Sequence, residues 1–214
     1  MQPKRRMIVG ISGASGIVYA VRLLQTLRAL RVETHLVVSK AGHLTREHET
    51  DLSAQDLRQL ADASYDVGDI GAAISSGSFR TLGMVVAPCS MRTLAEIATG
   101  VTTTLLTRAA DVVLKERRRL VLLAREFPFH GGHLKNMLAV TEMGAIVAPP
   151  VPAFYIRPKS IDDIVDQTIG RVLDLFDIDS DAFPRWGEDI ALKNGKHLPA
   201  SAQPRRREVE SPAI

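Results

Sequence analysis

The sequence has 214 residues, 45% of them hydrophobic and 24% charged, which excludes a disordered, collagen-like or coiled-coil chain. Its net charge of +3 comes from the tails, because residues 1–6 carry +3 and residues 201–214 carry +1, leaving −1 between them. With 5% aromatic residues, this distribution disfavours a nucleic-acid-binding protein. One cysteine rules out an internal disulfide and favours a cytoplasmic location, and no apolar run is long enough to predict a membrane span.

The first forty residues predict a strand, a glycine-rich turn, a helix and a second strand. Residues 7–11 are apolar, residues 12–16 contain only glycine, alanine and serine, and residues 17–30 have apolar side chains at helical spacing. Residues 33–38 are predicted to form the second strand. This order is typical of the beginning of a parallel α/β sheet.

The remaining chain continues the alternation. Strands are predicted at 84–87, 120–124 and 145–148, and helices over 41–49, 53–61, 93–98, 105–118, 133–141 and 161–176. Residues 63–80 are rich in glycine and serine, a composition that predicts an irregular, mobile segment. The sequence therefore predicts one α/β domain over residues 7–190, with a basic N-terminal tail (1–6) and a flexible C-terminal tail (191–214). The expected fold is a Rossmann-like or flavodoxin-like three-layer sandwich with a mainly parallel sheet of about six strands.

Polar turns follow the predicted strands. Because open α/β sheets bind ligands beyond the carboxyl ends of their strands, we expect the site at that edge. The turns lie at 12–16, 39–40, 88–93, 125–128 and 149–155.

The first turn has two interpretations. Gly10, Gly13 and Gly16 are spaced by three and allow a backbone to approach a phosphate at a helix N-terminus, where Ser12 and Ser15 add hydroxyl groups. Such a turn is also an ordinary connection between a strand and a helix. Nucleotide binding is the favoured interpretation.

A nicotinamide-dependent reductase is the rival enzyme class. The second strand ends in Ser39 and Lys40, where a ribose-binding acidic residue is expected. Tyr155 and Lys159 have the spacing of a short-chain reductase pair, but Pro158 prevents a regular helix through them. Both details disfavour this class.

The sequence gives little support for a cysteine nucleophile, a metal site or a serine hydrolase. Cys89 has no base near it in the sequence and is expected to be a small buried residue, not a nucleophile. His130 and His133 lack the further ligands of a metal site and are expected at a helix start. No Gly-x-Ser-x-Gly elbow of a serine hydrolase is present.

Ten segments together carry a resemblance that none of them would carry alone. They are Gly13–Gly16, Val38–Ala41, Ala87–Ser90, Ala95–Gly100, Arg108–Val112, Leu114–Arg118, Leu120–Glu126 with Pro128, His133–Leu134 with Asn136–Met137, Pro152–Tyr155 and Pro184–Glu188. In these segments the chain, over about residues 7–188, resembles the UbiX-type flavin prenyltransferases, formerly described as aromatic acid decarboxylases.

The resemblance implies a metal-independent prenyltransferase. Such an enzyme joins the dimethylallyl group of dimethylallyl phosphate to N5 and C6 of reduced FMN, and the prenylated FMN serves a UbiD-type decarboxylase. It also implies a homo-oligomer, a dodecamer, with the site at a subunit interface. An NAD(P)-dependent reductase and a non-catalytic FMN carrier remain the alternatives.

The resemblance also implies roles for individual residues. FMN would be held by Gly13, Ala14, Ser15, Ser39, Ser90, Met91, Arg92, Thr93 and Arg125, and dimethylallyl phosphate by Lys115, Glu126, Tyr155 and Arg171, with Arg125 near its phosphate. The implied catalytic residues are Ser15, Glu49, Lys115, Arg125, Glu126 and Trp186. Cationic groups would stabilise the departing phosphate, the Trp186 ring would stabilise the cation-like allyl fragment, and Glu49 would accept a proton.

Overall fold

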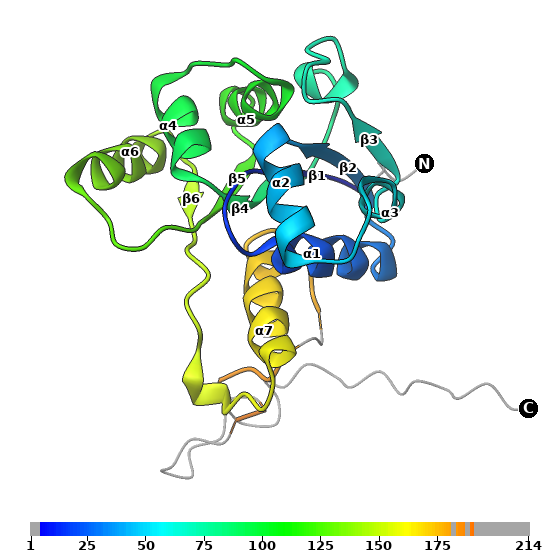
Figure 1. Ribbon diagram of the computed structural model, residues 1–214, viewed down its shortest axis with the longest axis vertical. Coiled ribbons are helices and arrows are strands. Elements are labelled where there is room, and N and C mark those ends of the chain that lie inside the picture. Colours follow the sequence, from blue (N-terminus) through cyan, green and yellow to red (C-terminus); the bar gives the residue numbers. More distant parts are fainter. Residues whose placement is uncertain (1–4, 181–182, 187–188, 191–214) are drawn as a thin grey trace, which may run out of the picture.

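The computed structural model of the chain describes residues 5–180, 183–186 and 189–190 (Figure 1). Within these residues, six strands form one sheet in the order β3-β2-β1-β4-β5-β6, and every neighbouring pair is parallel. The strands are β1 (Arg6–Ile11), β2 (Glu33–Val38), β3 (Ala63–Tyr65), β4 (Gly83–Cys89), β5 (Arg119–Ala124) and β6 (Ile146–Val147). This is the doubly wound order, so the predicted fold class is confirmed.

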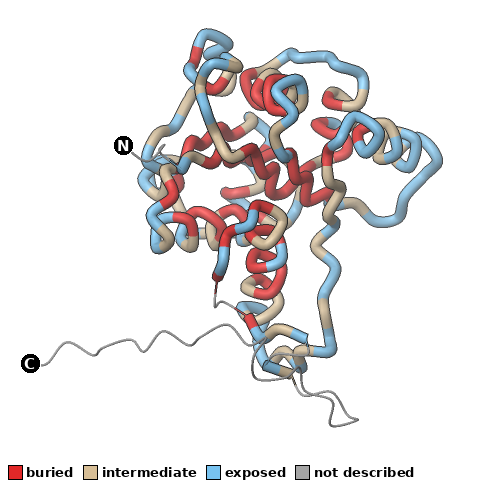
Figure 2. The backbone as a smooth tube through the Cα atoms, turned by 180° about the vertical axis from the view of Figure 1, so that it is seen from behind, coloured by how far each residue is buried: buried red, intermediate tan, exposed pale blue. Residues whose placement is uncertain are grey.

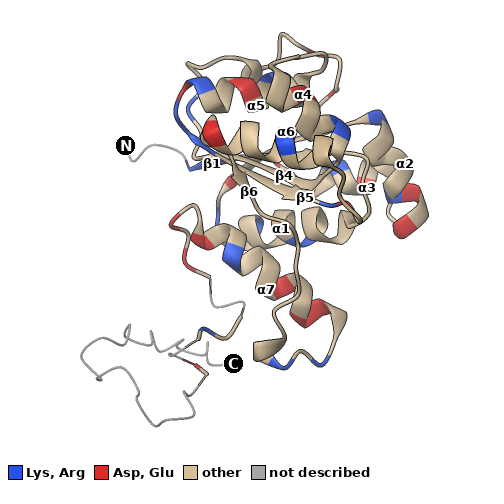
Figure 3. Cartoon of the chain, turned by 90° about the vertical axis from the view of Figure 1, so that its left-hand side faces the viewer, with Lys and Arg blue, Asp and Glu red and all other residues tan. Residues whose placement is uncertain are grey.

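Helices cover both faces of the sheet, which makes three layers (Figures 1 and 3). One face packs against α1 (Ile17–Ala29) and α7 (Ile161–Asp174), and the other against α4 (Met91–Thr99), α5 (Leu105–Lys115) and α6 (Gly131–Glu142). The short helices α2 (Lys40–Glu49) and α3 (Ala54–Gln59) connect β2 to β3.

The central strands are apolar throughout because both of their faces are buried. Along β1, Val9 and Ile11 belong to the core formed with α1 and α7, whereas Ile8 belongs to the core formed with α5. This alternation follows the two-residue period of a strand. Continuous apolar runs are therefore what a sheet covered on both sides requires.

The prediction of an irregular backbone throughout residues 63–80 is wrong. Its first residues form the edge strand β3, which pairs with β2, and residues 73–75 form a 3₁₀ turn that buries Ile74. Tyr65 bonds His35 of β2 through its hydroxyl, at 2.9 Å from Nδ1. A three-residue edge strand has too few apolar positions for the two-residue period to be visible in the sequence.

Other predicted elements are confirmed with shifted ends. The helix predicted over 105–118 ends at Lys115, because Arg117 adopts a left-handed backbone (φ 55°) and β5 begins at Arg119. The last strand is two residues long instead of four. The helix predicted from residue 93 begins at Met91, because Ser90 caps it.

Residues 148–160, which we call the arm, leave the end of β6 and lead to α7 (Figure 1). The arm contains a 3₁₀ turn, η2 (Phe154–Ile156), and none of its residues is buried (Figure 2). In the described part of the chain, no helix has the length and apolar character needed to cross a membrane. The predicted tails at 1–6 and 191–214 lie mostly or wholly outside the described residues.

Candidate active site

Ser12 joins the turns at the carboxyl edge of the sheet. Its buried hydroxyl donates to the carbonyl of Pro88 at 3.0 Å and accepts from the amide of Ser90 at 2.7 Å. The amide of Arg125 in turn donates to the carbonyl of Cys89 at 3.0 Å. The turns after β1, β4 and β5 therefore form one connected edge. The hydroxyl of Ser12 thus has an internal role in joining these turns.

The N-terminus of α4 lies in this edge. The Ser90 hydroxyl accepts from the amide of Thr93 and lies 3.2 Å from its hydroxyl oxygen. Met91 and Thr93 are buried, and exposed Arg92 bonds Glu96 at 3.1 Å. The first amides of a helix have no partner within the helix, so this end of α4 offers donors to an anion.

Gly13 and Ser39 bring the turn after β1 against α2. A Cβ atom at Gly13 would lie 3.2 Å from the carbonyl carbon of Ala41. Ser39 caps α2 by accepting from the amide of Gly42 at 2.9 Å. Ala14 is fixed through its amide, which donates to the carbonyl of Ser12 at 3.0 Å. The glycine is thus needed for close packing, whatever the turn binds.

Glu49 occupies the N-terminus of α1. Its carboxylate accepts from the amide of Gly16 at 2.9 Å and from that of Ile17 at 3.0 Å, and it also bonds the side chain of Ser15. The sequence suggested a ligand phosphate at this helix N-terminus. The structure places an internal carboxylate on two of its amides instead.

The charge of Glu49 is stabilised at this position. Partial burial raises its pKa, but the hydrogen bonds from Ser15, Gly16 and Ile17 and the positive charge of Arg125 outweigh burial, and the net pKa is lowered. A lowered pKa makes the carboxylate a weaker base. Glu49 is therefore suited to orienting Ser15 and Arg125 more than to accepting a proton.

The turn after β5 carries Arg125 and Glu126. Arg125 is exposed at the edge, and Glu126 is half-buried and accepts from the amide of Phe127 at 3.1 Å. The strand-edge group of predicted site residues is thus brought together by the fold. It consists of Gly13, Ala14, Ser15, Ser39, Glu49, Ser90, Met91, Arg92, Thr93, Arg125 and Glu126.

A second group lies where the arm meets α7. The rings of Tyr155 and Trp186 pack edge to face, with centroids 5.3 Å apart. Arg171 pairs with Asp174 at 2.8 Å, and Asp174 also receives two bonds from Arg185, the residue before Trp186. Tyr155, Arg171 and Trp186 therefore form an arm group within one chain.

A cavity of about 250 Å³ lies between the arm and α7. Arg171 lines it together with buried Gln167, one helical turn earlier, and with apolar residues such as Ala153 and Val172. Gln167 was not predicted from the sequence. A polar residue at a core position of a predicted amphipathic helix was the available signal.

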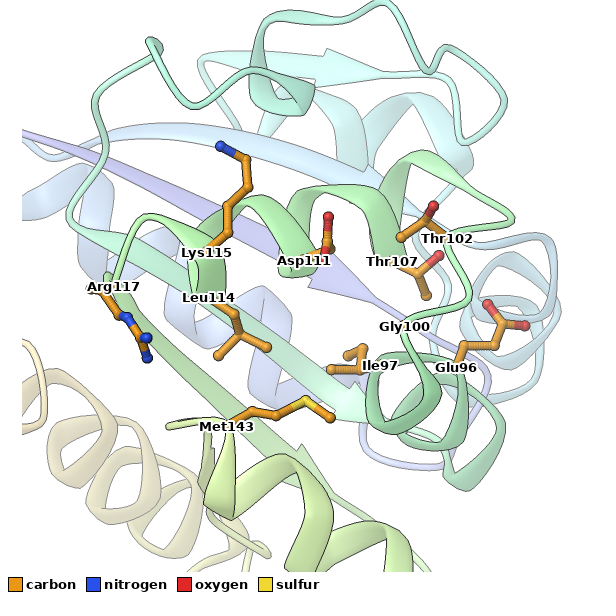
Figure 4. Close-up of a pocket in the computed structure, with 10 residues that line it drawn as sticks. All are labelled: Glu96, Ile97, Gly100, Thr102, Thr107, Asp111, Leu114, Lys115, Arg117 and Met143. Carbon is orange, nitrogen blue, oxygen red and sulfur yellow. The ribbon is translucent and has the colours of Figure 1, made fainter.

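Lys115 is not brought to either group within one chain. It ends α5, before β5 begins, whereas Arg125 follows the end of β5, and six residues of strand span roughly 20 Å. It lines a cavity of about 440 Å³ between α4, α5 and the end of α6. In Figure 4, Leu114 points toward Met143 and Lys115 points away from both.

The remaining sequence predictions concern residues near these groups. Cys89 is fully buried, as predicted, and burial raises the pKa of its thiol to about 12, which disfavours a thiolate nucleophile. His130 caps α6 by accepting from the amides of Gly132 and His133. Tyr155 lies in the 3₁₀ turn η2 and not on a helix shared with Lys159. No three His, Cys, Asp or Glu side chains cluster as metal ligands among the residues that the structure describes.

Comparisons with known proteins find relatives over most of the chain. The sequence model of the Flavoprotein family matches residues 1–173. The chain is 58% identical over 185 residues to flavin prenyltransferase UbiX of Escherichia coli (strain K12), covering 85% of this chain and 98% of that protein. It is 54% identical over 181 residues to the enzyme of the same name from Thauera aromatica, with 85% and 93% coverage.

Two solved structures are similar over most of the chain. AnUbiX (PadA1), in complex with FMN and dimethylallyl pyrophosphate, has a TM-score of 0.85 and 53% identity, covering 86% of this chain and 98% of that one. A dodecameric FMN-dependent UbiX-like decarboxylase from Escherichia coli O157:H7 has a TM-score of 0.83 and 53% identity, with 85% and 98% coverage. The chain therefore belongs to the UbiX-type flavin prenyltransferases of the Flavoprotein family.

Proposed function

We propose that the chain transfers the dimethylallyl group of dimethylallyl phosphate to N5 and C6 of reduced FMN and releases phosphate. The observation that carries the proposal is the strand-edge group, in which hydroxyl donors, a helix N-terminus and Arg125 meet at one edge of the sheet. AnUbiX, which has a similar fold, was solved in complex with FMN and dimethylallyl pyrophosphate.

The strand-edge group fits FMN. Ser15, Ser39 and Ser90 offer hydroxyl groups from three neighbouring turns, and the α4 N-terminus offers amides suited to a phosphate. When bound, reduced FMN supplies the nucleophilic N5 and afterwards C6. The chain's part is to hold it, with Gly13 allowing the first turn to pack closely and Glu49 fixing the Ser15 hydroxyl.

The prenyl donor needs cations at its phosphate and an apolar wall at its carbon chain. As the C–O bond breaks, the phosphate keeps the electron pair, and guanidinium groups stabilise that charge. Arg125 and Arg171 would serve there, Tyr155 would hold the phosphate, and the Trp186 ring would face the allyl fragment and exclude water. Closure at C6 adds a proton to the prenyl double bond and releases the proton of C6. The departing phosphate would accept the released proton, because the lowered pKa of Glu49 makes that carboxylate a weaker base.

Lys115 would complete the phosphate site from a second copy of the chain. Within one chain it is separated from Arg125 by the length of β5, while the aromatic pair Tyr155 and Trp186 is exposed on the arm. A homo-oligomer with composite sites, such as a dodecamer, unites the strand-edge group, the arm group and Lys115. We place this assembly in the cytoplasm, where its product would supply a UbiD-type decarboxylase.

Anaerobic incubation with reduced FMN and dimethylallyl phosphate tests the proposal, with mass spectrometry of the extracted flavin. A gain of one prenyl group is expected. FMN bound without any gain in mass would support the carrier function instead, and tight NADPH binding without FMN affinity would support a reductase. The same assay with dimethylallyl pyrophosphate distinguishes the two prenyl donors.

A further inference from the structure

The loop at residues 77–79 is fixed against the end of α5. The guanidinium of Arg118 donates to the carbonyl of Gly77 at 2.6 Å and to that of Phe79 at 2.8 Å. The Phe79 ring packs edge to face on His35 at 4.9 Å and lies under the guanidinium of Arg6 at 4.7 Å. The loop therefore has two anchors that do not depend on the side chain at position 77.

Lys115 is held at this loop by its neighbour. Its ammonium bonds one carboxylate oxygen of Glu116, and the other oxygen lies 4.0 Å from the Arg118 guanidinium. The bond from Lys115 and its charge lower the pKa of Glu116, so this carboxylate is ionised at neutral pH. Glu116 thus connects Lys115 to the residue that fixes the loop.

Gly77 leaves the room that this pair occupies. A Cβ atom at position 77 would lie 2.8 Å from Nζ of Lys115 and 2.7 Å from Cδ of Glu116. Gly77 is not among the residues with a positive φ, so its backbone is open to alanine. Both obstructing groups are the ends of flexible side chains. A methyl group there would displace the ion pair and leave the backbone in place.

We propose that Gly77 and Glu116 are positioning residues, which direct the Lys115 ammonium toward the phosphate of the prenyl donor. The inference rests on the proposed function, because it assigns Lys115 to a phosphate site completed by a second copy. It goes beyond the proposed function because it gives a role to the glycine- and serine-rich segment at residues 63–80. Neither the fold class nor the strand-edge group explains that segment. Gly77 leaves space for the ion pair, and the Glu116 carboxylate orients the Lys115 ammonium. Arg118 holds the loop against the end of α5.

The positioning role of Gly77 is tested by comparing Gly77→Ala with Gly71→Ala in the full-length protein. A Cβ atom at Gly71 would meet only Oδ1 of Asp69, at 3.5 Å, an ordinary contact, so this variant is the matched control. Gly77→Ala should lower kcat/KM for dimethylallyl phosphate about tenfold to a hundredfold, since small displacements of a positioned group cost rate of this order. The melting temperature and the Kd for FMN should not change, and Gly71→Ala should resemble the native protein.

A second background separates positioning from general loop damage. In a Lys115→Ala protein, Gly77→Ala should cause no further loss, because the group on which it acts is gone. A further loss in that background, or native kcat/KM for Gly77→Ala with Lys115→Ala impaired, would overturn the inference and leave the proposed function standing. Failure of the native protein to prenylate FMN would instead overturn the proposed function.

Amine labelling provides a readout that does not depend on turnover. The rate at which an acetylating reagent modifies Lys115, followed by peptide mass spectrometry, should rise in Gly77→Ala and Glu116→Ala, because the ammonium loses its ion-pair partner. It should stay native in Gly71→Ala. Native labelling in all variants would contradict the positioning roles of Gly77 and Glu116.

Discussion

The carboxylate of Glu49 performs at the start of α1 the task that a serine or aspartate performs in most helices. The N-cap residue, Gly16, has no side chain to accept from the first amides, and Glu49 reaches them from the end of α2. The same carboxylate bonds Ser15, and the positive charge of Arg125 helps to lower its pKa. The capping carboxylate therefore also bonds one predicted ligand of FMN, Ser15, and attracts another, Arg125.

Replacing Glu49 by glutamine tests this capping role. Loss of the charge should lower the free energy of unfolding by about 1 kcal/mol at pH 7, the usual value of a cap or helix-dipole interaction. Because the folded-state pKa is lowered, the contribution is complete above the ordinary pKa of a glutamate and is lost as the pH falls through the folded pKa. Denaturant unfolding across acid pH should show the native protein and Glu49→Gln converging. Glu142→Gln, at an exposed position, is the control, and an equal loss there would contradict the assignment.

Cys89 should be chemically silent in the folded protein. With a pKa of about 12 and complete burial, it presents neither thiolate nor access to a reagent. Iodoacetamide at pH 8 should leave it unmodified for hours and label it fully after urea denaturation, as read by intact-mass spectrometry. Rapid labelling of the folded protein would show that the turn after β4 opens.

At the scale of elements, the sequence predicts most of the sheet and its helices. Apolar runs identify β1, β2, β4 and β5 because these strands are covered on both faces. Edge strands carry less signal. β3 is three residues long and owes its position to pairing with β2, and β6 retains two residues of its predicted run. Pairing partners decide such strands, and they are not visible in a local window.

Helix ends depend on hydrogen bonds that a hydrophobic period does not contain. α7 begins after Ser160, whose hydroxyl accepts from the amide of Asp163 at 3.2 Å, while Asp163 accepts in return from the amide of Ser160. This capping box fixes where the arm stops and α7 starts.

Ser160→Ala should therefore weaken the junction between the arm and α7. We expect the free energy of unfolding to fall by about 1 kcal/mol. We also expect faster hydrogen exchange at the first turn of α7, because the amide of Asp163, the third of the helix, loses its acceptor. Ser160→Asp retains an N-cap acceptor and should behave as the native protein in both measurements. Unchanged exchange in Ser160→Ala would mean that Asp163, through its bonds to the backbone of Lys159 and Ser160, suffices.

At the scale of the whole molecule, the sequence predicts the membership of the site better than its geometry. The strand-edge residues could be located because a parallel sheet places its carboxyl ends together. Lys115 and the arm group could not, because in the proposed assembly their positions relative to Arg125 depend on a second copy of the chain. The exposure of Val151, Phe154 and Ile161 along the arm and its junction with α7 is consistent with a surface that another copy covers.

Mixing two inactive variants tests this composite site. Lys115→Ala and Arg125→Ala should each lose most prenyl transfer, since each removes a cation from the phosphate. If every site takes Lys115 from one copy and Arg125 from another, equal co-expression should restore about a quarter of the native sites by random assembly. If both residues came from the same chain, every site in the mixture would lack one of them.

The matched control pairs Arg125→Ala with Ser90→Ala, both in the strand-edge group of a single chain. That mixture should not recover, because each chain lacks one member of the same group. Recovery by Lys115→Ala with Arg125→Ala, and none by the control pair, assigns Lys115 to a different copy from Arg125. If both mixtures behaved alike, Lys115 and Arg125 of one site would have to come from the same chain. The separation of roughly 20 Å along β5 would then require a rearrangement within one chain.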